Sequence, residues 1–459
     1  KAAPLHLLYH VPDVSTSAFN FYLCCMTYQE TINYLFTRLP MFSRIGAAAI
    51  KKDLHNTIAL CEALDNPYTH FKSVHIAGTN GKGSVSHMLA AILQTAGYKT
   101  GLYTSPHLHD FRERIKVNGE MISKEFVVDF TQGIQPLIEE IEPSFFEITV
   151  AMAFEYFKQE KVDIAVIEVG LGGRLDSTNI ITPELSIITN IGWDHMNLLG
   201  DSLEEIAFEK AGIIKQAIPV VVGETLPETK PVFEEKASMM QAPLHFAYNE
   251  FNVTGKKTVD HQLVVDVRDR KTKADLQYTL DLPGSYQTKN ILTVLSSVRQ
   301  LQQQGWEISE EDIQTALASS KKINGLHGRW EVIHEHPTVV MDVGHNEDGV
   351  KQIVAQLHEY SYKKLHIVIG MVKDKEIEKV LALLPKDAQY YFTRAHIPRA
   401  LPEAELEAKA LTFDLNGKTF EHVNVAIASA MQQATKDDLI LVCGSVFLVG
   451  EVDVKAIGN

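Results

Sequence analysis

The sequence has little of several features that mark specialised classes of protein. It contains four cysteines in 459 residues, too few for a disulfide framework, which favours a reducing compartment. It also has no apolar stretch of the ~20 residues that a membrane-spanning helix requires. The longest candidate, at 439–449, is interrupted by Cys443, Gly444 and Ser445. We therefore expect a cytoplasmic protein without membrane contacts.

The sequence is also short of positive charge. It has 43 lysine and arginine residues against 58 aspartate and glutamate residues, a formal net charge of −15. An acidic surface argues against nucleic acid as a partner. An anionic small molecule must then be bound locally, by backbone amides or by a few well-placed cations, which directs attention to glycine-rich loops.

The first 25 residues lack the features of a secretory signal, because Lys1 alone could supply a positive charge at the start and no clear cleavage site follows a continuous apolar core. The chain does not begin with methionine, and Met26 opens a segment at 28–35 that is typical of an amphipathic helix. We interpret residues 1–25 as a non-native or dispensable N-terminal extension.

The rest of the chain alternates between apolar runs and longer segments with helical periodicity, which favours a mostly parallel α/β sheet covered on both faces. The apolar runs lie at 73–77, 163–169, 185–190 and 219–223, helical segments lie at 82–96, 124–138 and 203–211, and a β-rich patch follows at 244–282. A second α/β series follows the polar stretch 321–325, with strands expected at 338–342, 364–370, 389–393 and 438–442. We place a domain boundary near Asn324, which leaves a C-terminal domain of about 130 residues.

The strongest local motif is a glycine-rich loop between the predicted strand at 73–77 and the predicted helix at 82–96. Its residues are Gly78, Thr79, Asn80, Gly81, Lys82, Gly83 and Ser84. In such a P-loop, glycines let backbone N–H groups converge on phosphate at a helix N-terminus, while Lys82 would contact the outer phosphates and Ser84 would lie near Mg²⁺. The spacing departs from G-x-x-x-x-G-K-[ST], because Gly83 separates Lys82 from Ser84. The alternative is an ordinary glycine-rich turn.

Further motifs follow in a fixed order along the chain. They are Thr104-Ser105-Pro106-His107-Leu108, Glu168-Val169-Gly170-Leu171-Gly172-Gly173-Arg174-Leu175-Asp176, Asp194-His195, Glu209-Lys210-Ala211-Gly212-Ile213, Gly328-Arg329, Asp342-Val343-Gly344-His345-Asn346 and the segment 444–451. This set resembles the folylpolyglutamate synthase/dihydrofolate synthase branch of the Mur ligase superfamily, from about Met26 to the end of the chain. Two positions depart from the family pattern: Glu347 stands where proline is usual, and Tyr286 where histidine is common.

The resemblance implies a fold and a reaction. The fold would be a P-loop ATPase domain at 26–324 followed by a smaller Rossmann-like domain at 325–459, with the active site between them. The reaction would be ATP-dependent ligation of L-glutamate to dihydropteroate, to (tetrahydro)folate or to both, through an acyl phosphate, in folate biosynthesis and one-carbon metabolism. Metal ions and a lysine would offset the repulsion between the two anions.

The resemblance also implies a metal site with two Mg²⁺ ions, held by Ser105, Glu168, His195 and Lys210. An ammonium group cannot bind Mg²⁺, so Lys210 would act as a carbamate formed with CO₂, which requires a neutral amine. The alternatives are a solvated lysine at position 210 and a capping or core histidine at position 195.

The remaining site residues are assigned by the same resemblance. Asn290, Arg329 and Asp342 would bind the nucleotide together with the P-loop, and His345 and Asn346 would lie near the acyl phosphate or the incoming glutamate. The pterin substrate would contact Ser144, Phe145, Phe146, Glu147, Leu175, Asp176 and Ser177. The alternatives are a surface salt bridge for Arg329, a turn at Asn346 and core packing for the phenylalanines.

Two other classes of protein remain open. A P-loop regulatory NTPase would hydrolyse nucleotide without an amino acid, and a second α/β domain that carries its own motifs argues against it. Another Mur-type amide ligase would carry a UDP-binding domain before the P-loop, but only about 50 residues separate Met26 from Gly78. We expect a monomer with small-molecule partners only. Whether it makes dihydrofolate, extends folate tails or does both is left open by the sequence.

Overall fold

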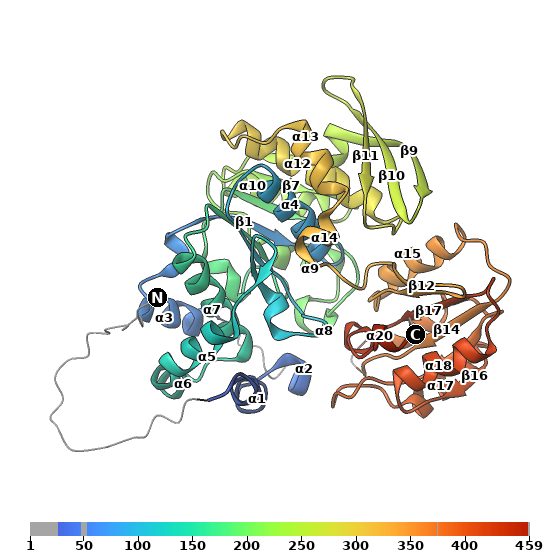
Figure 1. The fold of residues 1–459 in the computed structure, drawn as a ribbon. Helices are drawn as coiled ribbons and strands as arrows, with labels where there is room; N and C mark the ends of the chain where they lie inside the picture. Colours follow the sequence, from blue (N-terminus) through green and yellow to red (C-terminus); the bar gives the residue numbers. More distant parts are fainter. Residues whose placement is uncertain (1–25, 47–52, 374, 458–459) are drawn as a thin grey trace, which may run out of the picture.

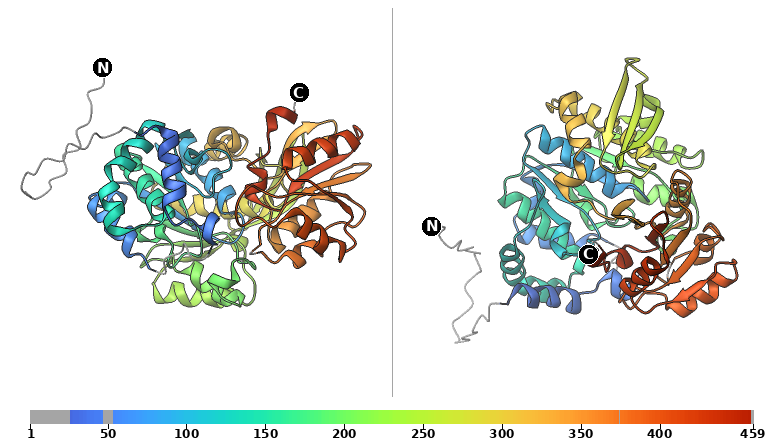
Figure 2. Two further views of the ribbon diagram at one scale, coloured as in Figure 1. Left: turned by 90° about the horizontal axis from the view of Figure 1, so that it is seen from below. Right: turned by 45° about the vertical axis from the view of Figure 1, so that its right-hand side comes forward.

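The structure is a computed structural model that describes residues 26–46, 53–373 and 375–457 (Figure 1). The predicted extension at 1–25 lies outside the described residues. Two parallel α/β sheets lie side by side, with a small antiparallel sheet at one end of the first (Figures 1 and 2). The predicted fold class is therefore confirmed. Across the described ranges, no helix combines the length and hydrophobicity needed to cross a membrane.

The larger sheet has eight strands in the order β4-β3-β2-β5-β1-β6-β7-β8. Strands β2 and β5 to β8 run parallel to β1, and β3 and β4 form an antiparallel edge. Every residue of β5 is buried, as expected for a central parallel strand covered on both faces. The strands are β1 (Lys72–Ala77), β2 (Thr100–Tyr103), β3 (Ile115–Val117), β4 (Glu120–Met121), β5 (Ile164–Glu168), β6 (Leu185–Ile188), β7 (Val220–Val222) and β8 (Leu244–Phe246).

Helices cover both faces of this sheet. Alternate residues of β5 divide between two cores: Ile164 and Val166 pack towards α4 and α12, while Ala165 and Ile167 pack towards α7. The helices of this part are α1 (Tyr28–Arg38), α2 (Phe42–Ile45), α3 (His55–Ala63), α4 (Lys82–Thr95), α5 (Lys124–Gly133), α6 (Gln135–Ile141), α7 (Phe145–Gln159), α8 (Met196–Leu199), α9 (Leu203–Ala211), α10 (Lys230–Met239), α11 (Ala247–Glu250), α12 (Gln287–Gln303), α13 (Glu310–Leu317) and α14 (Ser320–Asn324).

The helix predicted at 124–138 is wrong in its extent. The structure divides it into α5 and α6, and Pro136 stands in the first turn of α6. Proline lacks a backbone N–H and disfavours helical geometry in the residue before it, so it is placed better at the start of a helix than in the middle.

The β-rich patch is also divided differently from the prediction. Its first strand, β8, extends the main sheet, and the remaining strands form a separate antiparallel sheet in the order β11-β10-β9. These strands are β9 (Phe251–Val259), β10 (Gln262–Asp269) and β11 (Asp275–Leu280). Burial alternates along β10, so one face packs on α12 while the other faces solvent.

The C-terminal part has a six-stranded sheet in the order β12-β13-β17-β14-β15-β16, parallel except for the edge strand β12. The strands are β12 (Glu331–Glu335), β13 (Thr338–Met341), β14 (Leu365–Ile369), β15 (Gln389–Phe392), β16 (Gly417–Thr419) and β17 (Leu439–Cys443). The helices are α15 (Glu347–Leu357), α16 (Ile377–Leu381), α17 (Glu403–Leu411), α18 (Val423–Gln433), α19 (Val446–Val449) and α20 (Val454–Ile457). We refer to this part as the C-terminal domain and to residues 26–324 as the ATPase domain; the division at Asn324 itself stays a prediction.

Hydrogen bonds hold the connection between the two parts, at Asn324 and Gly325, against the larger sheet and helix α4. Helix α14 ends at Asn324, and Gly325 adopts a positive φ of 62°. The buried ammonium of Lys116 in β3 donates to the carbonyl of Asn324 at 2.5 Å, and the Asn324 side chain donates to the carbonyl of His87 in α4 at 2.9 Å. The chain therefore leaves the ATPase domain from a fixed point beside the P-loop helix.

Candidate active site

The predicted P-loop joins β1 to α4 at the carboxyl end of the larger sheet. Gly78 has a φ of 152°, and a Cβ there would lie 1.8 Å from the Thr189 hydroxyl oxygen. Gly81 has a φ of 84°, and a Cβ there would lie 2.4 Å from the Asn290 side-chain oxygen. Both positions therefore require glycine, for conformation and for space. The Asn290 side chain closes the loop from the α12 side.

Two side chains at the start of α4 face different ways. Lys82 Nζ donates to the carbonyl oxygens of Gly78 at 3.0 Å and Thr79 at 3.2 Å, and burial lowers its pKa. The Ser84 hydroxyl is buried and accepts a hydrogen bond from Gln287 Nε2 at 3.0 Å. Lys82 lines the central cavity, whereas Ser84 points towards α12.

Glu168 ends the buried strand β5 close to the same helix. A Cβ on Gly83 would lie 3.9 Å from Glu168 Oε2 and 3.6 Å from Arg329 Nη2, so the carboxylate and the guanidinium both lie beside Gly83. Burial raises the pKa of Glu168 to about 7, although Lys82 and Arg329 oppose the shift. The Glu168 carboxylate also accepts a hydrogen bond from the Ser105 backbone.

Lys210 is not the solvated lysine that its charged helix would suggest. Its side chain is buried, and its Nζ donates to the Gly78 carbonyl at 2.9 Å. Burial, reinforced by the charge of Lys82, lowers the pKa of Lys210 to about 7. A substantial fraction of neutral amine is therefore present at neutral pH, directly behind the P-loop.

One cavity of about 810 Å³ connects the P-loop with most of the predicted site. Its lining includes Ser105, His195, Lys210 and His345. All seven residues predicted to contact the pterin line the same cavity: Ser144, Phe145, Phe146, Glu147, Leu175, Asp176 and Ser177. Glu168, Asn290, Arg329, Asp342 and Asn346 are not part of this lining.

Several of the predicted pterin contacts also organise their own backbone. Ser144 and Glu147 form a reciprocal capping box at the start of α7, with Glu147 Oε2 accepting from Ser144 N at 2.6 Å. Asp176 accepts from the Thr178 and Leu171 N–H groups at 3.0 and 2.8 Å. These carboxylates therefore hold the cavity wall in shape whatever else they contact.

Asp342, which was predicted to bind the nucleotide, forms a hydrogen bond between the two domains. Its carboxylate accepts from the Tyr286 hydroxyl at 2.8 Å, from Trp330 N at 2.9 Å and from Gly344 N at 2.8 Å. Burial raises the pKa of Asp342, and the nearby Arg329 opposes that shift. Tyr286, which replaces the histidine common in the family, thus supplies a contact between α12 and the C-terminal domain.

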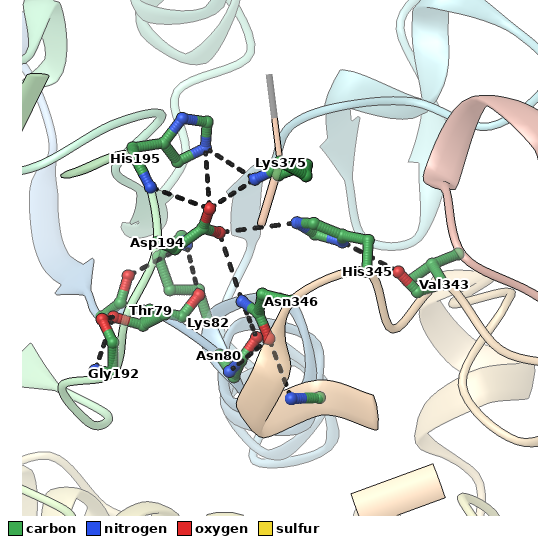
Figure 3. Close-up of polar contacts among 12 residues, drawn as sticks. Thr79, Asn80, Lys82, Gly192, Asp194, His195, Val343, His345, Asn346 and Lys375 are labelled. Atoms are coloured by element: carbon green, nitrogen blue, oxygen red, sulfur yellow. Dashed lines mark hydrogen bonds and ion pairs between the residues drawn. The ribbon is translucent and has the colours of Figure 1, made fainter. Parts of the chain in front are cut away.

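A polar cluster lies where the carboxyl ends of the two sheets meet (Figure 3). Asp194 accepts from Asn346 Nδ2 at 3.2 Å, lies 3.5 Å from His345 Nε2 and forms an ion pair with Lys375. Burial raises the pKa of Asp194, but the hydrogen bond from His345 and the charge of Lys375 outweigh it, so the pKa falls well below its ordinary value. Asn346 and Asn80 exchange two amide hydrogen bonds of 3.1 and 3.3 Å.

His195 stands beside this cluster at the start of α8, where its side chain forms no cap. Burial and the charge of Lys375 lower the pKa of His195 to about 3, so the imidazole is neutral at physiological pH. A neutral imidazole is the form that binds metal ions.

Comparison with known proteins identifies the family. The family model for the Mur ligase middle domain matches residues 76–298, and the model for the Mur ligase glutamate ligase domain matches residues 328–446. A dihydrofolate synthase/folylpolyglutamate synthase of Bacillus subtilis is 31% identical over 437 residues, which cover 93% of this chain and 98% of the relative. The chain belongs to the folylpolyglutamate synthase/dihydrofolate synthase family of Mur ligases. The predicted resemblance is therefore confirmed.

Solved structures of this ligase family share the fold. Escherichia coli FolC in complex with DHPP and ADP has a TM-score of 0.80 and 31% identity, and the match covers 94% of this chain and 98% of that one. A bifunctional folylpolyglutamate synthase/dihydrofolate synthase with Mn, AMPPNP and L-glutamate bound also has a TM-score of 0.80, with 29% identity and coverage of 94% and 98%.

Several charged residues that line the cavity of this Mur ligase were not among the predicted site residues, and Asp194, Lys375 and Arg114 are three of them. Asp194 was visible as the first half of the Asp194-His195 pair, directly beyond a predicted strand. Lys375 follows the apolar strand β14, a position where parallel sheets place functional groups. Arg114 donates to His107 Nδ1 at 2.8 Å and lies 5.3 Å from the centroid of the Phe145 ring. No sequence signal separates it from Arg112, two residues earlier.

Proposed function

We propose that this chain is an ATP-dependent ligase that joins L-glutamate to the carboxylate of dihydropteroate, of a reduced folate, or of both. The observation that carries the proposal is the single cavity, which runs from Lys82 at the P-loop to the aromatic wall at Phe146 and to His345 of the C-terminal domain. The P-loop would bind the phosphate donor, the aromatic wall would bind the flat carboxylic acid, and the C-terminal domain would bind the amino acid, so one cavity would hold all three reactants.

The P-loop would bind and orient the phosphates of ATP. Its glycine-dependent backbone and the N-terminus of α4 supply N–H groups and a positive dipole. Lys82, now bonded to its own loop carbonyls, would turn to the transferred phosphoryl group. Arg329 lies beside Gly83 and would stabilise charge there, while Asn290 and Asp342 would contact the base and the ribose.

Within the described residues, no group of three or more His, Cys, Asp and Glu side chains is placed to hold a metal ion, so the proposed Mg²⁺ site depends on donors of other kinds as well. Ser105, Glu168 and His195 offer a hydroxyl, a carboxylate and a neutral imidazole, but the Lys210 ammonium would repel a cation. A carbamate on Lys210 would reverse that charge. The lowered pKa of the Lys210 amine and its buried position favour the neutral form, which is the form that reacts with CO₂. Two Mg²⁺ ions held by these four residues would neutralise phosphate charge and polarise the phosphoryl group when bound.

The remaining residues would position the two acids. Transfer of the γ-phosphoryl group to the substrate carboxylate gives an acyl phosphate, and attack by the amine of glutamate then releases phosphate. His345 and Asn346 face this region from the C-terminal domain. Phe146 lies against the Gly170 backbone and would offer its face to the pterin, with Ser144, Phe145, Glu147, Leu175, Asp176 and Ser177 around it.

We also propose a monomeric cytoplasmic enzyme, with one domain at 26–324 and a second at 325–459. The two cysteines within the described residues, Cys61 and Cys443, are buried free thiols, which supports a reducing compartment. Size-exclusion chromatography with light scattering tests the monomer.

The decisive experiment is phosphate release from ATP. It is measured with glutamate plus dihydropteroate, and separately with glutamate plus tetrahydrofolate. Release that requires both the amino acid and one of these acids supports the proposal, and the acid that works identifies the specificity. Release that is independent of glutamate would instead indicate a regulatory NTPase.

A further inference from the structure

Asp194 is a single carboxylate on which three side chains of the C-terminal domain converge. Figure 3 shows Lys375 and His345 on one side of the Asp194 carboxylate, and Asn346 between that carboxylate and Asn80 of the P-loop. The distances are 3.5 Å from Asp194 Oδ2 to His345 Nε2 and 3.2 Å to Asn346 Nδ2, and Lys375 Nζ pairs with Oδ1. Asp194 and Lys375 are only 11% and 9% exposed.

These partners come from two separate loops of the C-terminal domain. His345 and Asn346 follow β13, and Lys375 follows β14, whereas Asp194 follows β6 of the larger sheet. Lys375 Nζ also lies 3.4 Å from His195 Nε2. One residue of the ATPase domain thus contacts two of the C-terminal loops that reach the cavity.

The cluster is fastened to the P-loop as well. Asn346 bonds both Asp194 and the Asn80 side chain, and the Asn80 N–H donates to Asn190 Oδ1 at 2.8 Å. The two oxygens of Asp194 accept from the His195 N–H, Asn346 and Lys375, and face His345. A carboxylate so fully engaged by protein groups acts through them rather than on a substrate.

We infer that Asp194 is a positioning residue of the ligation reaction. It holds His345, Asn346 and Lys375 at a fixed position relative to the P-loop. The residues proposed to bind glutamate are thereby placed next to the residues proposed to bind phosphate. The inference rests on the proposed function. A buried carboxylate hydrogen-bonded to charged and amide donors is well suited to this task, because such bonds are strong and directional.

The first test is Asp194→Asn, which preserves the shape but cannot neutralise Lys375. We expect kcat/KM for glutamate to fall about 10- to 100-fold, the usual effect of losing a residue that orients others in a site. The Kd for ATP should change less than about threefold, because the P-loop backbone is untouched. A purely structural role would instead lower the melting temperature and leave both constants alone.

A double-mutant cycle identifies the route of the effect. Lys375→Met removes the ammonium and keeps the length of the side chain. If Asp194 acts through Lys375, the double variant Asp194→Asn/Lys375→Met should lose no more than the worse single variant. Fully additive losses would overturn the inference. If Asp194→Asn fails to fold, Lys375→Met alone still tests the inference, because this variant should also lower kcat/KM for glutamate.

A matched control is available elsewhere between the same two parts of the chain. Lys256 in β9 pairs with Glu359 at 2.5 Å, and their side chains are 38% and 36% exposed. Glu359→Gln breaks this contact far from the cavity and should leave the glutamate and ATP constants unchanged. Glutamate constants that fall as much in Glu359→Gln as in Asp194→Asn would contradict a special role for Asp194.

Small-angle scattering of the ligand-free variants separates this inference from the proposed function. We expect Asp194→Asn to broaden the distribution of interdomain distances and Glu359→Gln to leave it near wild type. A wild-type protein without ligase activity would contradict the proposed function. The difference in scattering would still show whether Asp194 holds the two domains in a fixed relative position. Scattering and glutamate kinetics both at wild-type values in Asp194→Asn would overturn the inference.

Discussion

The carboxyl ends of the two parallel sheets face each other, but their loops are held in place differently. On the larger sheet, the P-loop is fixed within its own domain, by Gly78 and Gly81 packing on Thr189 and Asn290 and by hydrogen bonds to Asn190. On the smaller sheet, the corresponding loops find key partners across the cleft: Asp342 bonds Tyr286, Asn346 bonds Asn80 and Lys375 pairs with Asp194.

The P-loop is shaped by its backbone geometry and by contacts within its own domain, whereas Asp342, Asn346 and Lys375 owe part of their arrangement to residues of that domain. Under the proposed function, the first set of groups would form the phosphate side of the site and the second would form the amino-acid side. The ATPase domain also carries buried ionisable groups of opposite charge, Glu168 and Lys210, whose pKa values are both brought to about 7 by burial. Under the proposed function, the binding of metal and phosphate would therefore depend on pH near 7.

The largest expected effect breaks the phosphate side alone. Lys82→Ala removes the ammonium from the P-loop and should lower kcat by roughly 10³-fold, because a preorganised charge at a phosphoryl group is lost. Stability should change little, because the Lys82 ammonium bonds carbonyls of its own loop and its burial disfavours the charge. Lys72→Ala, at the exposed start of β1, is the matched control and should keep wild-type turnover. Unchanged turnover in Lys82→Ala at saturating ATP would contradict the P-loop assignment.

The second prediction concerns the charge of Lys210. Lys210→Ala should reduce ligation about 10²- to 10³-fold while ATP still binds, because the anion expected at the metal site is missing. Short carboxylic acids should restore part of the activity by occupying the vacated space. Depletion of bicarbonate should slow the wild type and leave the variant unaffected. Near-normal turnover of the variant would contradict the carbamate.

The pH profile sharpens the same point. Lys210 must lose a proton to become a carbamate, and Glu168 must lose one to bind a metal ion; the pKa of each lies at about 7. Activity should therefore fall as the pH decreases through about 7, and fall more steeply than a single titration because both groups act in the same direction. Initial rates between pH 5.5 and 8.5 test this, and a flat profile would count against both assignments.

Acid should destabilise the support of the P-loop. Burial lowers the pKa of His75 in β1 and of His87 in α4 to about 3, so both are neutral in the folded state. Between pH 6.5 and 3 the unfolded chain binds more protons, and stability is lost as the pH falls. Each histidine contributes about 1.4 kcal/mol per pH unit in that range. Urea unfolding at pH 7, 6 and 5 measures the slope, and equal stabilities would contradict it.

The smallest expected effect loosens the connection between the two sides. Lys116→Met leaves the carbonyls of Asn324 and Gly325 without the ammonium that bonds them, at a cost of about 1–3 kcal/mol. Hydrogen exchange should increase at residues 323–326, while the P-loop stays protected. Lys124→Met, at the exposed start of α5, serves as the control. Unchanged exchange at the connection would show that Lys116 does not hold it.

The sequence alone determined the features that depend on near neighbours. Glycines before Lys82 predicted the P-loop, apolar runs predicted the main strands, and the ordered motifs predicted the family. Of the four residues predicted to bind metal, Ser105, His195 and Lys210 line one cavity and Glu168 does not. The division of 124–138 at Pro136 was also readable from local rules, although the periodicity of the segment concealed it. For the P-loop, the strands and the division at Pro136, the controlling residues lie within a few positions of the feature.

The tertiary structure decided which distant groups meet. Asp194 bonds residues that lie 152 and 181 positions away, and Asn80 bonds one 266 positions away. The burial of Lys210, which sets its pKa, comes from the packing of its helix behind the P-loop rather than from its charged neighbours in sequence. Local sequence fixes backbone geometry, because torsion angles and hydrogen bonds act over a few residues. Charge pairing and desolvation across a cleft depend on how two folded sheets pack, and only the assembled structure specifies that.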